Sequence, residues 1–426
     1  MSKVNTIVAV LFHRLGPYHF ARLRAAGRLL PIVAIESSGV DETYAWDKVV
    51  GADRFERVTL FNHADAQRLP AAKVVSRVGS ALDKIHPAVV VVPGWADSAA
   101  LGALRWCVRN HVPAIIMSES TAWDEARSAW REAVKHRVVR LGSAALVGGM
   151  PHRDYMVKLG MPPECVFLGY DAVDNEYFAA GAAKWQKQPG EVEGQTLHGP
   201  RKSEVGRKYG LPENYFLASA RFIEKKNLSR LIEAYARYRT LAENAEKLKP
   251  ETLKSQIWDL VLLGDGPLRP ALCSQLQALG LHDHVQMPGF KQYLDLPAYY
   301  GLAGAFIHAS TTEQWGLVVN EAMASGLPVL VSSRCGCARD LVKDGVNGFT
   351  FDPYNVEQLA QLMFQISAFP PFRLSAFGDA SCQIIADWGP DHFASGLKAA
   401  AEKAIDVGPV KAGIFDQLLL KALIRR

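Results

Sequence analysis

The sequence predicts an α/β fold with two Rossmann-like domains, each built on a doubly wound parallel sheet. The 426 residues are too many for one ordinary core and suit two domains of roughly 150–200 residues each. Two series of short apolar runs alternate with segments of helical periodicity, and a polar segment separates the two series. Short buried strands that alternate with helices indicate a parallel sheet with helices on both faces.

The first series of predicted strands ends near Leu168. Because ligands of such sheets bind beyond the carboxyl ends of the strands, the informative loops are residues 13–19, 93–97 and 118–124. The predicted strands are residues 4–12, 31–35, 58–61, 88–92, 114–117, 144–147 and 166–168, and the helices include residues 69–85, 99–108 and 125–141.

The pattern lapses from about Phe178 to Tyr209. Residues 186–194 are polar, turn-rich and aperiodic, as is typical of a linker or a surface insertion. We therefore predict an N-terminal domain over residues 1–178, a linker over 179–210 and a C-terminal domain over 211–385, with a ligand cleft between the domains. The second series has predicted strands at residues 215–219, 260–263, 285–287, 305–308 and 329–331, and helices at residues 228–245, 268–279, 317–325 and 356–366.

Composition excludes several classes of protein. A hydrophobic content of 49% with 21% charged residues is typical of a soluble globular protein. The net charge of +5 is a mild excess, and it favours no nucleic-acid partner. Residues 7–12 are too short for a signal-peptide core, and no run of apolar residues is long enough to span a membrane. We therefore expect a cytoplasmic protein.

Six scattered cysteines fit unpaired, buried thiols in a reducing compartment. Cys335 and Cys337 form an isolated C-x-C, and no second pair lies nearby in the sequence. We therefore reject a zinc site.

The strongest local signal is the segment Ala309-Ser-Thr-Thr-Glu-Gln-Trp-Gly-Leu-Val-Val-Asn-Glu-Ala-Met-Ala-Ser-Gly-Leu-Pro-Val. A strand is expected to end near Ser310 and a helix to begin near Gly316, which would let a ligand approach the backbone closely. The N–H groups of the first helical turn, together with the helix dipole, form an anion site. These groups belong to Trp315, Gly316, Leu317 and Val318.

Two carboxylates flank this predicted anion site. Glu313 precedes the helix, and Glu321 lies five residues inside it, about 7.5 Å further along the axis. A pocket between the two acids suits a diphosphate, with sugar hydroxyls on one side and ribose hydroxyls on the other.

A diphosphate also needs compensating positive charge. Arg221 and Lys226 follow the predicted strand 215–219, and an arginine fork and a lysine charge both suit phosphate oxygens. The alternative is that both are solvated loop charges, but their place at a strand end in the domain of Glu313 favours the ligand role. The chain contains no Asp-x-Asp, so we expect no metal cofactor.

These motifs together resemble those of a known family. Arg221 and Lys226, then Leu263-Gly-Asp-Gly-Pro, then Met287-Pro-Gly-Phe, then Glu313-x7-Glu321 with Ala-Ser-Gly-Leu-Pro-Val, are similar in order to the retaining GT-B glycosyltransferases of family GT4. The resemblance covers about residues 215–352. It implies two Rossmann-like domains that face each other across a cleft, with the acceptor on the N-terminal side and the nucleotide sugar on the C-terminal side. It also implies that residues 386–426 cross back to the N-terminal domain.

The same resemblance assigns roles to residues. It implies that Glu313 contacts the donor sugar, that Glu321 holds the ribose, and that the backbone near Gly289 faces the base. The implied catalytic residues are Arg221, Lys226, Glu313 and Glu119, and the implied donor-binding residues are Gly16, His19, Gly264, Gly289, Phe290, Trp315, Gly316, Leu317, Val318 and Glu321.

Two positions depart from the family pattern. Trp315 stands where the family usually has Phe, which is a tolerable aromatic exchange. Glu119 stands where many relatives have a His near the reaction centre. We expect Glu119 in the active site but assign it no proton-transfer role.

The first loop of the N-terminal domain is also similar to that of the family. In Gly16-Pro-Tyr-His19, Gly16 permits a close approach, and His19 is placed to donate to phosphate or acceptor. A structural role for a histidine at a helix start remains open. Trp95 is either a wall for the acceptor or part of the core.

The resemblance implies transfer of a hexose-type sugar, with retention at the anomeric carbon, from a nucleotide-diphosphate sugar to a hydroxyl acceptor. The acceptor is a glycan, a lipid-linked molecule or a small molecule. Other hypotheses are a nucleotide-sugar epimerase, a phosphorylase of the same architecture, or a non-catalytic module that binds sugar nucleotides or glycans. No cofactor lysine motif favours the phosphorylase.

Two basic amphipathic segments lead to the hypothesis that the protein contacts an anionic membrane peripherally. Residues 125–141 carry Arg127, Arg131 and Lys135 beside an apolar stripe, and residues 414–426 combine apolar residues with Arg425 and Arg426. The alternative is that each apolar face packs on its own domain and that the cations are solvated.

Overall fold

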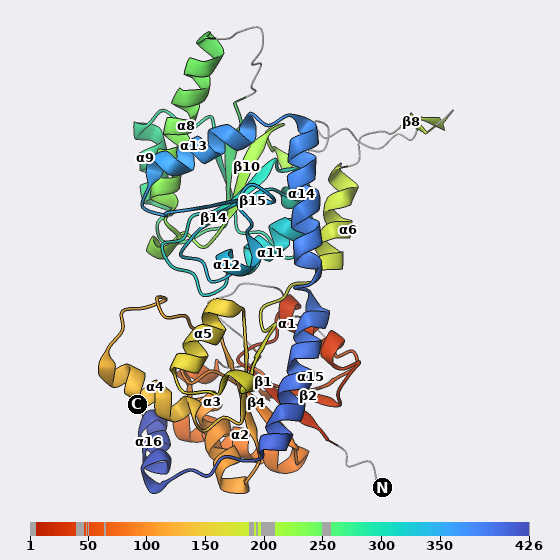
Figure 1. Ribbon diagram of the computed structural model, residues 1–426, viewed down its shortest axis with the longest axis vertical. Helices are drawn as coiled ribbons and strands as arrows, with labels where there is room; N and C mark the ends of the chain where they lie inside the picture. Colours follow the sequence, from red (N-terminus) through yellow and green to blue (C-terminus); the bar gives the residue numbers. More distant parts are fainter. Residues whose placement is uncertain are drawn as a thin grey trace. The chain divides into compact units, whose positions relative to one another are not determined.

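The computed structural model describes residues 6–39, 47, 49, 51–63, 65–186, 191–192, 195–196, 209–248 and 257–425. The chain forms two compact units. Unit 1 joins the chain up to Asp174 with the segment Trp388–Arg426, and unit 2 is Asn175–Asp387. Each unit contains one parallel sheet with helices on both faces (Figure 1). The predicted fold class is therefore confirmed.

Unit 1 contains a seven-stranded sheet in the order β3-β2-β1-β4-β5-β6-β7. Every strand pair in it is parallel. The predicted strand 4–12 is β1 from Val8 onward, and residues 4 and 5 lie outside the described residues. The strands are β1 (Val8–Phe12), β2 (Ile32–Ser38), β3 (Glu56–Phe61), β4 (Val89–Pro93), β5 (Ala114–Ser118), β6 (Ala144–Val147) and β7 (Val166–Leu168).

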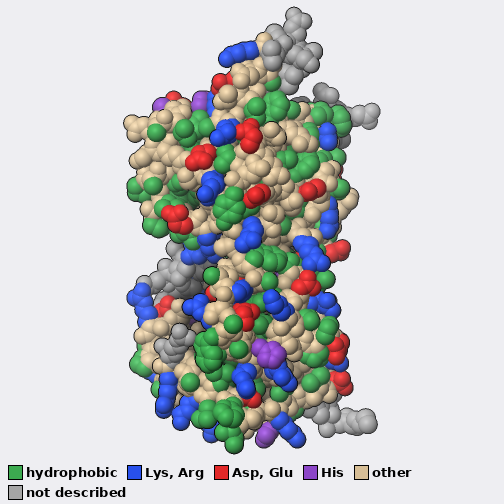
Figure 2. All heavy atoms as spheres, turned by 60° about the vertical axis from the view of Figure 1, so that its left-hand side comes forward, with side chains coloured by type: hydrophobic (Ala, Val, Ile, Leu, Met, Phe, Trp, Pro, Cys, Tyr) green, Lys and Arg blue, Asp and Glu red, His purple; other side chains and the backbone are tan. Residues whose placement is uncertain are grey.

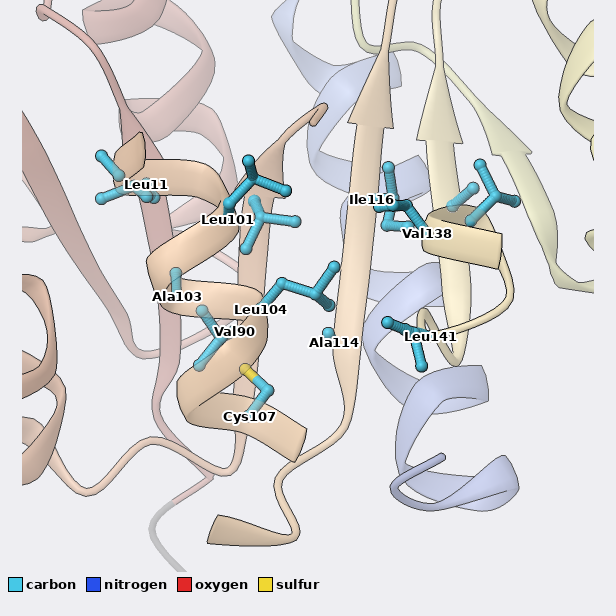
Figure 3. Packing of buried hydrophobic residues seen from close by; sticks show 14 of the residues in the cluster. Leu11, Val90, Leu101, Ala103, Leu104, Cys107, Ala114, Ile116, Val138 and Leu141 are labelled. Carbon is cyan, nitrogen blue, oxygen red and sulfur yellow. The ribbon is translucent and has the colours of Figure 1, made fainter. Parts of the chain in front are cut away.

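Alternate side chains of β1 enter two core layers, which is why this strand is apolar throughout. Val8 and Val10 pack with α1 (Pro17–Ala26) and α15 (Pro390–Val407), whereas Leu11 belongs to the layer on the other face. Figure 3 shows that second layer, where α3 (Ser98–Asn110) packs Leu104 towards β4 and β5. The remaining helices of unit 1 are η1 (Ala66–Arg68), α2 (Ala71–Ile85), α4 (Ala129–Val139), α5 (Met150–Lys158), η2 (Pro163–Cys165) and α16 (Ile414–Arg425).

Helix α4 begins at Ala129, and the predicted start at residue 125 is wrong. Arg127 holds the preceding residues in a loop, because its side chain donates to the carbonyl groups of Thr121 and Ala122 and pairs with Asp124. The cations of this segment are also bound within the protein, since Lys135 Nζ lies 2.7 Å from Glu125 Oε1. Arg127 and Lys135 are therefore not solvated charges on a free helical face.

Unit 2 contains a six-stranded parallel sheet in the order β12-β11-β10-β13-β14-β15. Sequence analysis located five of its strands and missed β15 (Gly348–Phe351), which completes the edge beside β14. The other strands are β10 (Tyr215–Ser219), β11 (Asp259–Leu263), β12 (Val285–Gly289), β13 (Ala305–His308) and β14 (Val329–Ser332).

The helices of unit 2 match the predicted periodic segments and add several others. Helix α6 (Asn175–Gln186) occupies the start of the predicted linker, and Gly181 packs closely on Pro297 of α10 (Leu296–Leu302). Most of the predicted linker, residues 187–190, 193–194 and 197–208, lies outside the described residues. The remaining elements are β8 (Glu191–Val192), β9 (Gln195–Thr196), η3 (Glu224–Lys226), α8 (Leu228–Leu248), α9 (Arg269–Ala278), α11 (Leu317–Ala324), α12 (Ala338–Leu341), α13 (Val356–Ser367) and α14 (Pro371–Ala386).

All six cysteines are free thiols, as expected. Cys335 and Cys337 are buried, but Cys273 and Cys382 are exposed rather than buried. The two exposed residues lie on the outer faces of α9 and α14, where the helical pattern does not require a core residue.

A buried charge fixes the loop after β1. Glu36, two residues before the end of β2, is 1% exposed, and its carboxylate accepts from the backbone N–H of Leu15 at 2.7 Å. Both of its oxygens lie 3.0 Å from Arg57 Nη2, and Thr59 Oγ1 donates at 2.9 Å. The network satisfies the buried carboxylate and holds the backbone next to Gly16.

We predict that Arg57→Ala lowers the free energy of unfolding by about 3 kcal/mol or more, because it leaves the buried Glu36 carboxylate without its cation. Denaturant unfolding measures the change. Arg24→Ala is the matched control in the same unit, since Arg24 is half-exposed where it pairs with Asp174 and its loss should cost less than about 1 kcal/mol. Equal losses in the two variants would contradict the assignment.

Candidate functional site

Three loops meet at the carboxyl edge of the sheet in unit 2. The N–H of Ala220 donates to the carbonyl of Leu263 at 2.9 Å, and the N–H of Gly264 donates to the carbonyl of Gly289 at 3.1 Å. Gly264 has φ 127°, and a Cβ at this position would lie 1.9 Å from the carbonyl oxygen of Ala220. Only glycine fits this close approach, so the Gly-Asp-Gly-Pro motif joins β10, β11 and β12 at their ends.

The loop after β10 is also attached to the end of β13. Asn227 adopts φ 59°, and its buried side-chain amide donates to the carbonyl of Ala309 at 3.0 Å and to that of Pro353 at 2.8 Å. The N–H of Thr311 donates to the carbonyl of Lys225 at 2.9 Å. These bonds place Lys226 against the loop that carries Glu313.

Lys226 and Glu313 lie 87 positions apart in the sequence, and their side chains form an ion pair. Glu313 Oε2 also lies 3.3 Å from His308 Nε2 and 3.3 Å from Ser310 Oγ. Both side chains of the ion pair are 12% exposed, so the pair is largely shielded but reaches the surface. A carboxylate with three donors and a partly exposed ammonium group form a polar site of defined geometry.

The electrostatics of this cluster keep Glu313 ionised. Burial opposes ionisation, but the hydrogen bond from His308 and the charge of Lys226 outweigh it and hold the pKa of Glu313 below its ordinary range. Burial lowers the pKa of His308, although Glu313 opposes this effect, so the ring is neutral and acts as a donor. The pair therefore contributes to stability above the ordinary pKa of glutamate and loses that contribution as the pH falls through the lowered pKa.

Helix α11 begins directly after this cluster. Gly316 caps it with φ 105°, a left-handed conformation that strains any other residue. Trp315 is buried and anchored, since its Nε1 donates to Asn320 Oδ1 at 2.8 Å. Leu317 and Val318 are half-buried at the first turn, where backbone N–H groups have no intrahelical acceptor. The predicted anion site and Glu313 thus lie on one continuous segment.

Glu321 lies on the buried face of α11 rather than beside Glu313 at the surface. It is 1% exposed, and its Oε2 accepts from the hydroxyl of Tyr300 at 2.6 Å. Burial is the main cause that raises the pKa of Tyr300, followed by the charge of Glu321, so the hydroxyl stays a donor. The contact of Glu321 with a ribose stays a prediction.

The other predicted donor residues of unit 2 lie at the same sheet edge. Arg221 is exposed at the start of the loop that ends in Lys226. Phe290 is 41% exposed after β12, and open space surrounds the position of a Cβ at Gly289. The structure therefore brings Lys226 into contact with Glu313 and leaves Arg221 and Phe290 at the surface of this edge.

In unit 1, His19 has a structural role that also fixes its tautomer. The N–H of Gly16 donates to His19 Nδ1 at 3.2 Å, and the same contact joins Gly149 to His152 at 3.1 Å at the start of α5. Burial and then the charge of Arg22 lower the pKa of His19 to about 3. The ring is therefore neutral with its proton on Nε2, which leaves that atom a donor.

Two further predicted positions of unit 1 are placed clearly. Trp95 packs against the buried core, which agrees with the core alternative. Glu119 follows β5 and lies beside Asp171 and Arg22, two buried charged residues that sequence analysis missed. Asp171 follows the predicted strand 166–168, so its position at a strand end was the available signal. Sequence analysis also missed His308, the last residue of β13, and Asn227, which follows η3.

No group of three or more potential metal ligands occurs among the residues that the structure describes. Within this described part of the chain, no helix is both long and apolar enough to cross a bilayer.

Comparison with known proteins identifies part of the chain. Residues 203–373 match the family model of glycosyl transferases group 1. The chain is 30% identical to the alpha-monoglucosyldiacylglycerol synthase of Acholeplasma laidlawii over 148 residues, which are 34% of this chain and 33% of that enzyme. It is 27% identical to the alpha-D-kanosaminyltransferase of Streptomyces kanamyceticus over 174 residues, which are 41% of this chain and 42% of that enzyme. The matched segments thus span less than half of each relative.

Solved structures agree in fold over nearly the whole chain. HepE from Anabaena in complex with UDP and glucose superposes with a TM-score of 0.66 at 16% identity, covering 92% of this chain and 98% of that chain. Sucrose-phosphate synthase from Thermosynechococcus elongatus superposes with a TM-score of 0.67 at 16% identity, covering 92% and 97%. These structures show that the chain has the two-domain GT-B fold, and residues 203–373 resemble the glycosyl transferases group 1 family.

Proposed function

We propose that this protein is a retaining, metal-independent glycosyltransferase. It moves a hexose-type sugar from a nucleotide-diphosphate sugar to a hydroxyl acceptor in glycan, polysaccharide or glycolipid synthesis. The observation that supports this proposal best is the Lys226–Glu313 ion pair immediately before the first turn of α11. An anion site, a cation and an ionised carboxylate there match the charges and hydroxyl groups of a sugar diphosphate.

Each group of the site has a chemical task in this proposal. The diphosphate accepts hydrogen bonds from the N–H groups of Leu317 and Val318, and Lys226 and Arg221 balance its charge in place of a metal ion. Glu313 accepts from hydroxyl groups of the donor sugar, because its lowered pKa keeps it ionised at neutral pH. Glu321 accepts hydrogen bonds from the ribose hydroxyl groups in this proposal.

Retention follows if the leaving phosphate takes the proton of the incoming hydroxyl on the same face of the sugar. The new glycosidic bond forms as the bond to phosphate breaks, and the proton ends on the phosphate oxygen. Preorganised charges stabilise the leaving group, so no protein nucleophile is needed. The UDP-glucose complex of HepE, although it shares only the fold, makes UDP-glucose the first donor to test.

A non-catalytic module and a nucleotide-sugar epimerase remain the alternatives. A binding module releases no free sugar and transfers none, whereas a transferase hydrolyses its donor slowly when the acceptor is absent. An epimerase would change the sugar and leave it attached to the nucleotide. Chromatography of UDP-, GDP- and ADP-sugars after incubation separates the three functions.

We predict that Lys226→Ala and Glu313→Ala each reduce turnover by about a hundredfold or more, because each removes a charge aimed at the transition state. Initial rates of sugar transfer measure the effect, and thermal unfolding checks the fold. Lys343→Ala is the matched control, since Lys343 is exposed and its ammonium group donates to the carbonyl of Arg339. Near-normal rates in a folded Lys226→Ala variant would refute the proposed site.

We also propose that helix α16 contacts an anionic membrane surface, where lipid-linked acceptors occur. Ile414, Phe415 and Leu418 are 79%, 77% and 57% exposed, and the exposed cations Lys421 and Arg425 lie on the same side of the helix. The opposite side is buried on unit 1 through Leu420 and Ile424. Figure 2 shows basic and hydrophobic side chains next to each other in the lower part of the view, where Figure 1 places α4 and α16.

The double variant Phe415→Ser with Leu418→Ser should weaken binding to anionic vesicles at least tenfold, because each buried apolar side chain contributes about 1.5–3 kcal/mol. Co-sedimentation with phosphatidylglycerol and phosphatidylcholine vesicles measures the binding. Phe372→Ser is the control, since Phe372 is an equally exposed aromatic residue of α14. Equal recovery of the native protein with both kinds of vesicle would contradict the membrane contact.

A further inference from the structure

Two carboxyl groups meet at the carboxyl edge of the sheet in unit 1. Glu119 follows β5, and Asp171 follows β7. Asp171 is 1% exposed, whereas Glu119 is half-buried and reaches solvent. The side chain of Asp171 lies within hydrogen-bonding reach of Glu119. A buried acid therefore packs directly behind an accessible one.

The buried acid lacks an ordinary donor. Neither carboxyl oxygen of Asp171 has a hydrogen-bond donor among the described residues. Arg22 Nη2 approaches Asp171 Oδ1 only to 3.9 Å, which is too long for a hydrogen bond. Arg22 instead donates from Nε to the carbonyl of Ala172 at 2.8 Å and lies over the ring of Tyr170.

The charges in this cluster balance with a single proton. Two ionised carboxylates next to one guanidinium would leave a net negative charge in a buried site, which is unfavourable. Burial, followed by the charge of Glu119, raises the pKa of Asp171 well above its ordinary value, and Arg22 only partly opposes this shift. Burial also raises the pKa of Tyr170, and His19 is neutral, so neither changes the balance near neutral pH.

Protonation of Asp171 gives its carboxyl group a hydrogen-bond partner. Its O–H has the carboxylate of Glu119 as a hydrogen-bond acceptor, and the negative charge of Glu119 then balances the positive charge of Arg22. Because the Glu119 side chain reaches solvent, its carboxylate is also accessible to water or a ligand.

We propose that Asp171 is a neutral positioning residue whose carboxylic O–H orients the Glu119 carboxylate to accept a hydrogen bond from the acceptor hydroxyl group. This inference rests on the proposed glycosyltransferase function, and it gives Glu119 a task on the acceptor side that needs no proton transfer. In other active sites, too, a group that contacts the substrate is oriented by a second side chain hydrogen-bonded to it.

The pH dependence has a definite sign. As the pH rises through the raised pKa of Asp171, the proton is lost, and two adjacent carboxylates repel each other. The folded protein keeps this proton at pH values where the unfolded chain has already released it. Stability is therefore highest below the ordinary pKa of aspartate, falls as the pH rises from there to the raised pKa, and no longer changes with this group above it. Turnover falls as the pH rises through the raised pKa, because Glu119 loses its orientation.

Three variants test the inference. Asp171→Ala should lower kcat about a hundredfold with little change in KM for the nucleotide sugar. Asp171→Asn keeps a donor towards Glu119, so it should restore most of the lost turnover and remove the decline at high pH. Asp174→Asn is the matched control, since Asp174 pairs with Arg24 at 3.2 Å and should leave the pH profile unchanged.

A spectroscopic readout separates this inference from the proposed function. Infrared spectra of the ligand-free protein at neutral pH should contain the carbonyl stretch of a protonated carboxylic acid, assigned by carbon-13 aspartate and absent in Asp171→Asn. Absence of this band in the native protein, or equal losses in Asp171→Ala and Asp171→Asn with unchanged pH profiles, would overturn the inference. The band in a protein that transfers no sugar would refute the enzyme function and the acceptor role of Glu119, while establishing the Asp171–Glu119 hydrogen bond.

Discussion

The ion pair between Lys226 and Glu313 is the contact on which the candidate site of unit 2 depends. It joins the loop after β10 to the loop after β13, and these two strands are neighbours in the sheet. A largely buried charge pair is tolerated only when further hydrogen bonds satisfy both groups. His308 and Ser310 supply them to Glu313, and Asn227 fixes the backbone next to Lys226.

This constraint explains why the surrounding backbone is so closely specified. Gly264 leaves no room for a side chain against Ala220, and Gly316 starts α11 in a left-handed conformation. Gly264 directly follows β11, and Gly316 lies between the loop that carries Glu313 and the start of α11. A small shift of either loop would separate the charges, so the local backbone and the electrostatics of the site depend on each other.

Unit 1 also contains buried carboxyl groups, but different side chains surround them. Glu36 is satisfied by Arg57, Thr59 and the backbone of Leu15, and it thereby holds the loop that leads to Gly16. Asp171 has no such partners and stands next to Glu119 instead. Of these two buried acids, Glu36 is paired with a cation and fully hydrogen-bonded, whereas Asp171 is neutral. The difference follows from the hydrogen-bond donors within reach of each carboxyl group.

The sequence by itself determined the two doubly wound sheets and the donor motifs, because apolar periodicity and glycine or proline positions are local properties of the chain. Strands β6, β7, β10 and β13 have the predicted bounds. It missed β15, which pairs only at the edge, and it began α4 too early because Arg127 holds a competing loop. Only the tertiary structure decided that Lys226 pairs with Glu313, that Glu321 turns inward to Tyr300, and that Asp171 lies behind Glu119. These contacts join residues far apart in sequence, and which donors reach a buried carboxylate is set by packing in three dimensions.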